Sequence, residues 1–373
     1  MKNNVRGIVN LFNAPSLGVL TKTRNYGSVT FLGRYGLIDF ILSDFTNSGI
    51  DEIDILVDAF PTSLRRHISE GSTFLINTKL GGITLITDES GKTRKEYNNE
   101  ITAILANNFK PEKINADYVI IAPAHMLYNC DFKPYIEEHI RSGKDITVLG
   151  KEIHELDEKF RGCHLVKTDK DGSVLGLPTY RSTNKSGVLS LETYILSKDL
   201  YASMIKEQPE INKAYGFYEM FAHYIKENRY SFAYLRYKGF VLPITSLEAY
   251  LNNSFWLLPY PNRQLFFNED LPIYTTTHDT PPVLYTETAE VKNSFVANGS
   301  VIKGKVINSI ISRNVLVDSD AVVEDSILFT GTEVGKNAKL KYVLTDKGAV
   351  INKNKSVKGK KDEFSVIALG ETK

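Results

Sequence analysis

Short runs of apolar residues alternate with a helical pattern over the first ~250 residues. Four runs lack the polar alternation of half-exposed strands and predict buried parallel strands; they are Gly7–Leu11, Asp54–Val57, Tyr118–Ala122 and Ile146–Leu149. Between the first two runs, apolar residues at the spacing i, i+3, i+4 and i+7 predict a helix with one apolar face; these are Ile38, Ile41, Leu42 and Phe45. Gly49 fits a C-terminal cap. We expect an α/β, Rossmann-like domain with a mostly parallel sheet, in which ligands bind beyond the carboxyl ends of the strands.

The last third of the chain has a different period. Aliphatic residues recur at every sixth position, at Ile310, Leu316, Val322, Leu328, Val334 and Leu340. Small or turn-forming residues follow four positions after the first five of them, at Asn314, Asp320, Ser326, Thr332 and Ala338. A period of six does not fit the 3.6-residue repeat of a helix. It predicts a parallel β-helix, in which each short strand stacks on the strand of the coil below.

A proline-rich, aromatic segment separates the two patterns. Leu257–Asn262 and Thr280–Pro282 together contain four prolines, which is typical of a connecting segment. We therefore predict an α/β domain over residues 1–255, a linker over 256–285 and a β-helix over 286–373.

Composition restricts the possible partners. Lys and Arg number 45 and Asp and Glu 44, so the formal net charge of +1 does not favour nucleic acid or an anionic membrane. No apolar run approaches the ~20 residues of a membrane-spanning helix, and the start of the chain lacks the apolar segment of a signal peptide. The two cysteines, Cys130 and Cys163, form no disulfide framework. We expect a cytoplasmic protein.

Several motifs resemble one family over nearly the whole chain. The most specific are Leu17–Thr21, Gly33–Phe40, Asn47–Ile50, Ser63–Ile68 and Asn308–Ser312. They resemble ADP-glucose pyrophosphorylase (glucose-1-phosphate adenylyltransferase), which makes ADP-glucose from ATP and glucose 1-phosphate for glycogen or starch synthesis. The resemblance implies a nucleotidyltransferase α/β domain followed by a C-terminal left-handed β-helix.

The positions that would hold phosphate in active relatives are altered here. Leu11, Phe12 and Ala14 stand where the resemblance places the glycines of a phosphate loop, and Ser16 stands where it places an arginine. Glycines in such a loop let backbone N–H groups approach phosphate oxygens. Tyr26 replaces a lysine that would help to hold the phosphates.

The positions implied for magnesium and for the sugar phosphate are altered as well. Ala124 and Pro243 stand where the family has two aspartates that bind Mg²⁺, an ion that requires oxygen ligands. The sugar-phosphate lysine falls in Leu175–Pro178, where no lysine occurs. We therefore expect no catalytic residues, no cofactor, no Mg²⁺ at the family metal site and little or no activity of the chain itself.

This combination resembles the non-catalytic regulatory subunit of bacterial glycogen synthesis. The resemblance implies a hetero-oligomer, in particular a tetramer, in which this chain acts allosterically on a catalytic subunit. A small sugar-phosphate or nucleotide effector is a further expected partner. Candidate positions for an effector or another anion are Lys22, Arg24, Arg34, Arg65, Arg66 and His67. An oligomer contact or plain solvent exposure would explain these basic residues equally well.

Two other functions remain open at this point. An active nucleotidyltransferase would need replacement carboxylates near the carboxyl edge of the sheet, and Asp131 and Glu192 are candidates. An acyltransferase built on the six-residue repeat would need a histidine there, but none occurs after His278. His125 follows Ala124 in the altered metal segment and is either a ligand or, as we favour, a histidine satisfied within the core.

Overall fold

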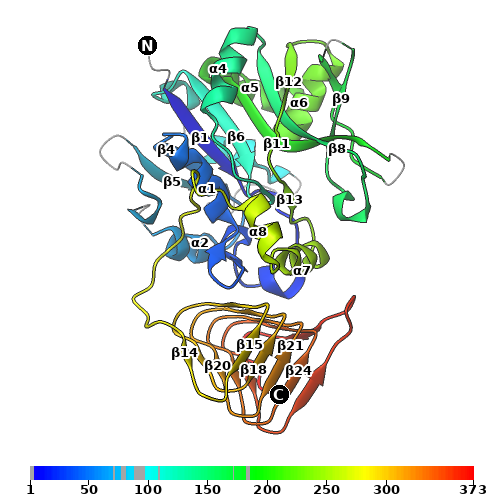
Figure 1. Ribbon diagram of the computed structural model, residues 1–373. Coiled ribbons are helices and arrows are strands. Elements are labelled where there is room, and N and C mark those ends of the chain that lie inside the picture. The colour runs from blue at the N-terminus through cyan, green and yellow to red at the C-terminus, as the bar shows by residue number, and fades with distance from the viewer. Residues whose placement is uncertain are drawn as a thin grey trace. The chain divides into compact units, whose positions relative to one another are not determined.

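The computed structural model describes residues 4–69, 72–76, 81–87, 97–107, 110–170, 172–181 and 185–373. The chain forms two compact units, neither of which is continuous in sequence (Figure 1). The first comprises the chain up to Pro15, Ile38–Thr245 and Phe266–Tyr274, and the second comprises Ser16–Leu37, Ser246–Leu265 and Thr275–Lys373. The predicted boundaries at residues 255 and 285 stay predictions.

A mixed sheet organises the first unit. In the described part of the chain its strand order is β10-β9-β11-β6-β1-β4-β5, with β8 paired to both β11 and β12. Neighbours β6, β1, β4 and β5 are parallel, whereas β11 runs antiparallel to β6 and β8. The strands are β1 (Val5–Asn10), β4 (Glu52–Val57), β5 (Gly82–Thr87), β6 (Tyr118–Pro123), β8 (Ile146–Ile153), β9 (Leu165–Thr168), β10 (Val174–Gly176), β11 (Gly187–Ser197) and β12 (Phe232–Arg236). The four strands predicted from apolar runs are thus found as β1, β4, β6 and β8.

The predicted helix is α1 (Ile38–Asn47), and its four predicted apolar residues are at most 3% exposed. Gly49, with φ of 72°, follows its end as expected. Gly7 in β1 shows why this helix packs closely on the sheet, because a Cβ atom there would lie 2.8 Å from the ring of Phe45. Burial of this apolar face, rather than helix propensity, stabilises a helix of ten residues.

Five further α-helices lie in the described part of the first unit: α2 (Pro61–Ile68), α3 (Glu100–Ala106), α4 (Lys133–Ser142), α5 (Lys198–Ile211) and α6 (Phe217–Lys226). Local capping sets where two of them begin. The side chain of Asn99 accepts a hydrogen bond from the backbone N–H of Thr102 at α3, and Ser197 accepts one from Leu200 at α5. A short antiparallel pair, β7 (Met126–Leu127) with β13 (Leu242–Pro243), completes this unit.

The second unit contains the predicted left-handed parallel β-helix. Three parallel sheets of five strands have the orders β14-β17-β20-β23-β26, β15-β18-β21-β24-β27 and β16-β19-β22-β25-β28. In Figure 1 these strands run from yellow to red. They are β14 (Leu284–Tyr285), β15 (Glu290–Lys292), β16 (Phe295–Val296), β17 (Val301–Ile302), β18 (Lys305–Ile307), β19 (Ile310–Ile311), β20 (Leu316–Val317), β21 (Val322–Glu324), β22 (Ile327–Leu328), β23 (Glu333–Val334), β24 (Lys339–Lys341), β25 (Val343–Thr345), β26 (Val350–Ile351), β27 (Ser356–Lys358) and β28 (Ser365–Ile367).

In the first half of the six-residue series, the residues in the core are each one position later than predicted. The corresponding residues in the apolar core of the β-helix are Ile311, Val317, Val323, Leu328, Val334 and Leu340, so one step is five residues long. Left-handed turn residues show the same short step, at Asn308, Asn314, Asp320, Asp325, Gly331 and Asn337. From β18 to β27 strands pair at a separation of 17 residues, as in Val317 with Val334. Pairs such as Val301 with Leu316 are separated by 15 residues, and Val343 pairs with Ser365 at 22. The coils therefore differ in length, which a strict period of six does not capture.

A hairpin and two short α-helices precede the β-helix strands in this unit. The hairpin strands are β2 (Thr30–Phe31) and β3 (Tyr35–Gly36), and the first helix is α7 (Leu247–Trp256). A further helix, α8 (Tyr260–Phe266), lies inside the predicted linker. Its proline, Pro261, stands in the first turn, where a missing N–H removes no helical hydrogen bond. In the part of the chain that the structure describes, no helix combines the length and apolar character needed to cross a bilayer.

Candidate functional site

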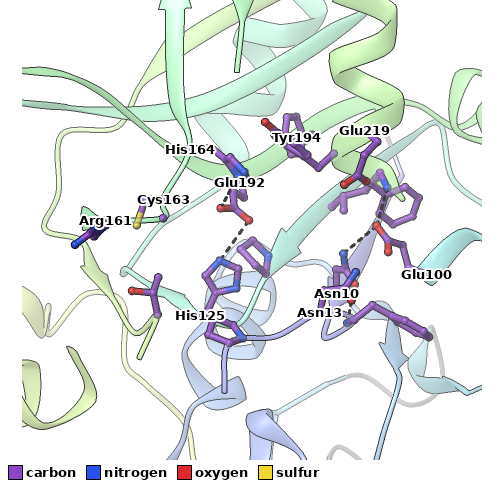
Figure 2. Close-up of a pocket in the computed structure, with 18 residues that line it drawn as sticks. Asn10, Asn13, Glu100, His125, Arg161, Cys163, His164, Glu192, Tyr194 and Glu219 are labelled. Carbon is purple, nitrogen blue, oxygen red and sulfur yellow. Dashed lines mark hydrogen bonds and ion pairs between the residues drawn. The ribbon is translucent and has the colours of Figure 1, made fainter. Parts of the chain in front are cut away.

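A pocket of about 390 Å³ opens in the first unit near the carboxyl ends of β1 and β6 (Figure 2). This is the edge at which parallel α/β sheets bind ligands. The loop after β1 and the segment after β6 form one part of its wall, and β11 and the start of α6 form another. Its lining residues are Asn10, Phe12, Asn13, Pro15, Glu100, Ile121, Pro123, His125, Arg161, Gly162, Cys163, His164, Glu192, Tyr194, Phe217, Tyr218, Glu219 and Thr245.

Large side chains fill the loop that follows β1. Leu11 is 1% exposed and Phe12 is 5% exposed. The ring of Phe12 belongs to the hydrophobic core and also lines the pocket. Its backbone N–H donates to Oδ1 of Asn10 at 3.0 Å, so this donor is already used within the loop. Ala14 is half-buried, and the hydroxyl of Ser16 is exposed and accepts a hydrogen bond from the N–H of Gly18 at 3.3 Å.

The segments that contain Ala124 and Pro243 lie side by side. Pro243 pairs with Met126 across β7 and β13, and the N–H of Ile244 donates to the carbonyl of His125 at 2.7 Å. Ala124 and Pro243 are buried and have no side-chain oxygen. The side chains at these two positions therefore do not fit a magnesium ion. Across the described ranges, no group of three or more His, Cys, Asp and Glu residues could hold a metal ion.

Glu192 and two histidines form a charged cluster in the pocket. Oε2 of Glu192 lies 3.3 Å from Nε2 of His125, and Oε1 lies 3.1 Å from Nδ1 of His164. Burial disfavours the charged carboxylate, but the two imidazoles outweigh it and lower the pKa of Glu192. His125 is thus paired in the pocket wall, with 15% of its side chain exposed.

Glu192 also has an unusual backbone conformation. Its φ is 51°, a left-handed value at which a non-glycine residue costs roughly 1–2 kcal/mol. The residue lies where the pairing of β11 with β8 shifts register between Ser190 and Thr193. Such strain persists where surrounding structure enforces it and is concentrated at functional sites.

A second group of polar residues lies across the pocket from Glu192 (Figure 2). Glu100 is 4% exposed, accepts a hydrogen bond from the N–H of Phe217 at 2.6 Å and one from the side-chain amide of Asn10 at 3.3 Å. Burial raises the pKa of Glu100 to about 7, against the opposing effect of these hydrogen bonds. Glu219 accepts a hydrogen bond from the N–H of Gly216 at 3.0 Å.

Two further lining residues have clear local roles. The ring of Tyr218 stacks on His164, with centroids 3.9 Å apart and an interplanar angle of 15°. Burial raises the pKa of the Cys163 thiol to about 12, so this thiol is neutral at physiological pH. Asp131, the other carboxylate considered for a rebuilt site, is not among the lining residues. Its Oδ1 accepts a hydrogen bond from the N–H of Lys133 at the start of α4.

Three of the predicted anion-binding residues, together with Tyr26, belong to the second unit. Lys22 and Arg34 are exposed, whereas Arg24 is 5% exposed and pairs with Asp346 at 2.7 Å. Its guanidinium also lies 6.0 Å from the centre of the Phe329 ring. Tyr26 is 4% exposed, and burial raises the pKa of its phenol.

The other three belong to the first unit, on α2. Arg65 and Arg66 are exposed, and Nε2 of His67 lies 2.5 Å from Oδ1 of the buried Asp39. A role for any of the six residues in binding an effector stays a prediction.

Sequence reasoning missed the cluster around Glu192. Glu192 and His125 were each considered separately, and His164 gave no signal. The three residues come from segments far apart in the chain, and only the pairing of the strands brings them together. Glu100 was missed for a similar reason, because it lies in α3 without a motif around it.

Comparisons with known proteins agree with this architecture. A family model described as nucleotidyl transferase matches residues 17–239, which is more than half of the chain, and one described as GlmU-like, C-terminal hexapeptide, matches residues 283–364. A glucose-1-phosphate adenylyltransferase of Clostridioides difficile is 28% identical over 94% of this chain and 92% of its own. That of Bacillus cytotoxicus is 25% identical over 95% and 94%, and that of Fervidobacterium nodosum is 27% identical over 90% and 81%. The chain therefore belongs to the nucleotidyl transferase family and is similar over nearly its whole length to glucose-1-phosphate adenylyltransferases.

Proposed function

We propose that this chain is a non-catalytic, regulatory subunit of a glucose-1-phosphate adenylyltransferase that makes ADP-glucose for glycogen synthesis in the cytoplasm. One observation carries the proposal. The loop after β1, where a nucleotide's phosphates would lie, is filled by Leu11 and Phe12, and Ala124 and Pro243 leave the adjoining segments without a carboxylate.

The physical reason is electrostatic. Nucleotidyl transfer depends on positioning the phosphates and on neutralising charge as it develops during the reaction. A metal ion supplies several kcal/mol of that stabilisation, and each ~1.4 kcal/mol is a factor of ten in rate. Here the metal-binding carboxylates, the phosphate loop and the cations are altered together. Turnover by the chain alone would therefore be lower by several orders of magnitude.

A chain without turnover can still control turnover in a partner. We infer that it assembles with a catalytic subunit in a hetero-oligomer, in particular a tetramer. Contacts that differ between a less active and a more active arrangement of the partner would shift the balance between the two. A sugar-phosphate or nucleotide effector that binds this chain would act through the same coupling.

The test uses the chain alone and together with the glucose-1-phosphate adenylyltransferase of its own host. ADP-glucose formation is measured with ATP, glucose 1-phosphate and Mg²⁺. We expect no measurable rate for the chain alone, co-purification of the two chains, and a changed kcat or glucose 1-phosphate dependence in the mixture.

A control shows which of the two chains produces the ADP-glucose in the mixture. The partner is inactivated at its own magnesium-binding aspartates and mixed with this chain, and ADP-glucose formation should disappear. Activity in that mixture, or in this chain alone, would contradict the non-catalytic assignment. Failure of the two chains to associate or to influence one another would contradict the regulatory one.

A further inference from the structure

The last two coils of the β-helix have a strong local charge in a chain that is nearly neutral overall. Residues 336–361 contain nine lysines, no arginine and one acidic residue, Asp346, whereas the whole chain has a formal net charge of +1. Asp346 is buried and paired with Arg24, so it does not neutralise these lysines. Like charges held close together repel one another and oppose the folded state. A surface that keeps this cost is a candidate interface.

Eight of the nine lysines belong to one sheet of the β-helix and the turns that flank it. They lie on β24, on β27 and in the adjoining segments, and they are Lys336, Lys339, Lys341, Lys353, Lys355, Lys358, Lys360 and Lys361. β24 and β27 are neighbours in this sheet, where Lys341 is paired with Lys358. Side chains on one face of a strand lie about 6.7 Å apart and adjacent strands lie about 4.8 Å apart. The lysines therefore form a basic stripe two strands wide.

The β-helix itself shows which chemical group fits such lysines. Between earlier coils, lysines pair with carboxylates of the adjacent coil, as Lys341 does with Glu324 at 2.9 Å. β27 is the last strand of its sheet, so no coil follows it. In the part of the chain that the structure describes, Lys355 and Lys358 form no ion pair. The position that an acidic coil would take beside them is therefore open.

The outer edge of β27 also has free backbone groups. The N–H of Gly359 donates to the carbonyl of Lys341 at 2.9 Å, and Val357 packs against the core of the β-helix. In a parallel pair, alternate residues of a strand bond to the same neighbour, and the residues between them turn their N–H and C=O groups away. The backbone groups of Ser356 and Lys358 therefore face away from β24, and both side chains are exposed.

The neighbouring sheet shows how such an edge is covered. The N–H of Val350 in β26 donates to the carbonyl of Glu371 at 2.8 Å, and the N–H of Lys373 donates to that of Val350 at 2.9 Å. The end of the chain thus lies beside β26 in parallel, as a further strand would. Among the described residues, no strand lies on the outer edge of β27.

The basic stripe suits carboxylates better than a nucleic acid. Proteins that bind nucleic acid single strands hold phosphates with arginine forks and stack the bases on exposed aromatic rings. Residues 336–361 have no arginine, and their one aromatic residue, Tyr342, is half-buried against Phe364. An extended acidic peptide, in contrast, presents carboxylates about 6.7 Å apart on one side, which matches the spacing of the lysines.

We propose that the edge of β27 binds an extended acidic segment of a partner protein, which adds to the sheet as a further strand. Backbone hydrogen bonds to Ser356 and Lys358 hold the segment, and its carboxylates pair with the lysines of the basic stripe. A second copy of this chain fits poorly, because its own β27 would bring the same positive charge to the edge. The inference goes beyond the proposed function and does not depend on it.

The experiment measures the binding of labelled probes to the whole chain by fluorescence anisotropy in about 150 mM salt. The probes are a ten-residue peptide of alternating Glu and Thr, the same peptide with Gln in place of Glu, and a ten-nucleotide uridine RNA. We expect the acidic peptide to bind saturably and at least ~10-fold more tightly than either other probe. RNA binding as tight as that of the acidic peptide, or no saturable binding of the peptide, would overturn the proposal.

Variants locate the binding site. Lys355→Glu with Lys358→Glu should weaken binding of the acidic peptide at least ~10-fold. Lys110→Glu with Lys113→Glu, the same change in charge at exposed positions of the first unit, should leave it unchanged. Ser356→Pro removes one outward N–H at an edge that tolerates proline, and it should also weaken binding without a change in Tm. Unchanged affinity in the lysine variant would overturn the proposal, and unchanged affinity in Ser356→Pro would overturn the addition of a strand.

Sedimentation of the chain alone tests the other occupant. Association between copies that is lost in the variant with Lys355→Glu and Lys358→Glu would identify a second copy as the occupant and overturn the proposal. We expect the same sedimentation for this variant and the parent chain. No catalytic partner is present in these measurements, so a negative result leaves the association and activity tests of the proposed function intact.

Discussion

Glu100 shows how a single buried carboxyl group ties stability to pH. Its pKa rises from 4.5 to about 7 because it is buried. In the unfolded chain the group loses its proton near pH 4.5, whereas in the folded chain it keeps the proton until about pH 7. The unfolded state therefore binds fewer protons between these values, and this group makes the folded state less stable as pH rises. The penalty has its full size of about 3 kcal/mol above pH 7 and vanishes below pH 4.5.

We predict that Glu100→Gln gains stability relative to the parent chain as pH rises from 4.5 to 8. The amide keeps an acceptor for the N–H of Phe217 but does not titrate. The measurement is the difference in Tm between variant and parent at several pH values, so that other titrating groups cancel. We expect this difference to grow by a few degrees over the window, and parallel pH profiles would contradict the raised pKa.

Arg24 and Asp346 form a buried ion pair within the second unit, with side chains 6% and 1% exposed. Removing one partner leaves an uncompensated charge in a site that excludes water. We predict that Arg24→Met or Asp346→Leu alone lowers stability by about 3–5 kcal/mol. The double variant should lose less than either single variant, because it leaves no unpaired charge.

Chemical denaturation measures this cycle. The control is Lys360→Ala, because the Lys360–Glu363 pair of the same unit has side chains 82% and 79% exposed. That change should stay within about 1 kcal/mol of the parent. Additive losses from Arg24 and Asp346 would show that the two side chains do not act as a pair.

At the scale of elements, the close approach of successive coils in the β-helix limits the size of the side chains that fit at its turns. Adjacent strands of a sheet lie about 4.8 Å apart, which leaves little room at the turns. A Cβ atom at Gly304 would lie 2.3 Å from the carbonyl oxygen of Ala321 in the next coil. This neighbour is backbone, so it cannot move aside without disturbing the coil.

Gly304→Ala should therefore destabilise the protein by roughly 1–3 kcal/mol, as overpacking does elsewhere. Gly82→Ala is the matched control, because a Cβ atom there would meet nothing within 4 Å. The two variants are compared by thermal unfolding. Equal Tm values would mean that the coil spacing tolerates a methyl group at Gly304.

At the scale of the whole molecule, the proposed function treats the loop after β1 and the segments of Ala124 and Pro243 as two independent losses. Restoring the two carboxylates should not restore phosphate binding by the loop, and turnover requires both. We predict that Ala124→Asp with Pro243→Asp yields no ADP-glucose formation above the parent chain in the presence of Mg²⁺. Leu11 and Phe12 still fill the loop in this variant, and Ser16 and Tyr26 still supply no cation.

The same variant makes a prediction about stability. Ala124 is 1% exposed, so a carboxylate placed there is buried without a partner, which should lower Tm. Activity together with unchanged Tm would show that the metal site needs only its two carboxylates, and the prediction that the loop blocks turnover independently would then fail. The parent chain is the control for both measurements.

Local pattern was sufficient for the two kinds of architecture and for part of the first unit. The apolar runs of β1, β4, β6 and β8, the apolar face of α1 and the aliphatic period of the β-helix each follow from which residues avoid water, and neighbours in sequence decide this. The same holds for the side chains on which the proposed function depends. Ala124 and Pro243 have no side-chain oxygen in any fold, and Leu11 and Phe12 are bulky wherever the loop lies.

Only the tertiary structure decided what depends on residues that are distant in sequence. It set the five-residue step from Val323 to Leu328 in the β-helix, because stacking on the neighbouring coil selects which aliphatic residue points inward. It also placed Glu192 between His125 and His164. It buried Glu100 where the carboxyl group accepts a hydrogen bond from the N–H of Phe217. Ion pairing and desolvation depend on distances of a few ångströms, and these arise only when strands from different parts of the chain pair into one sheet.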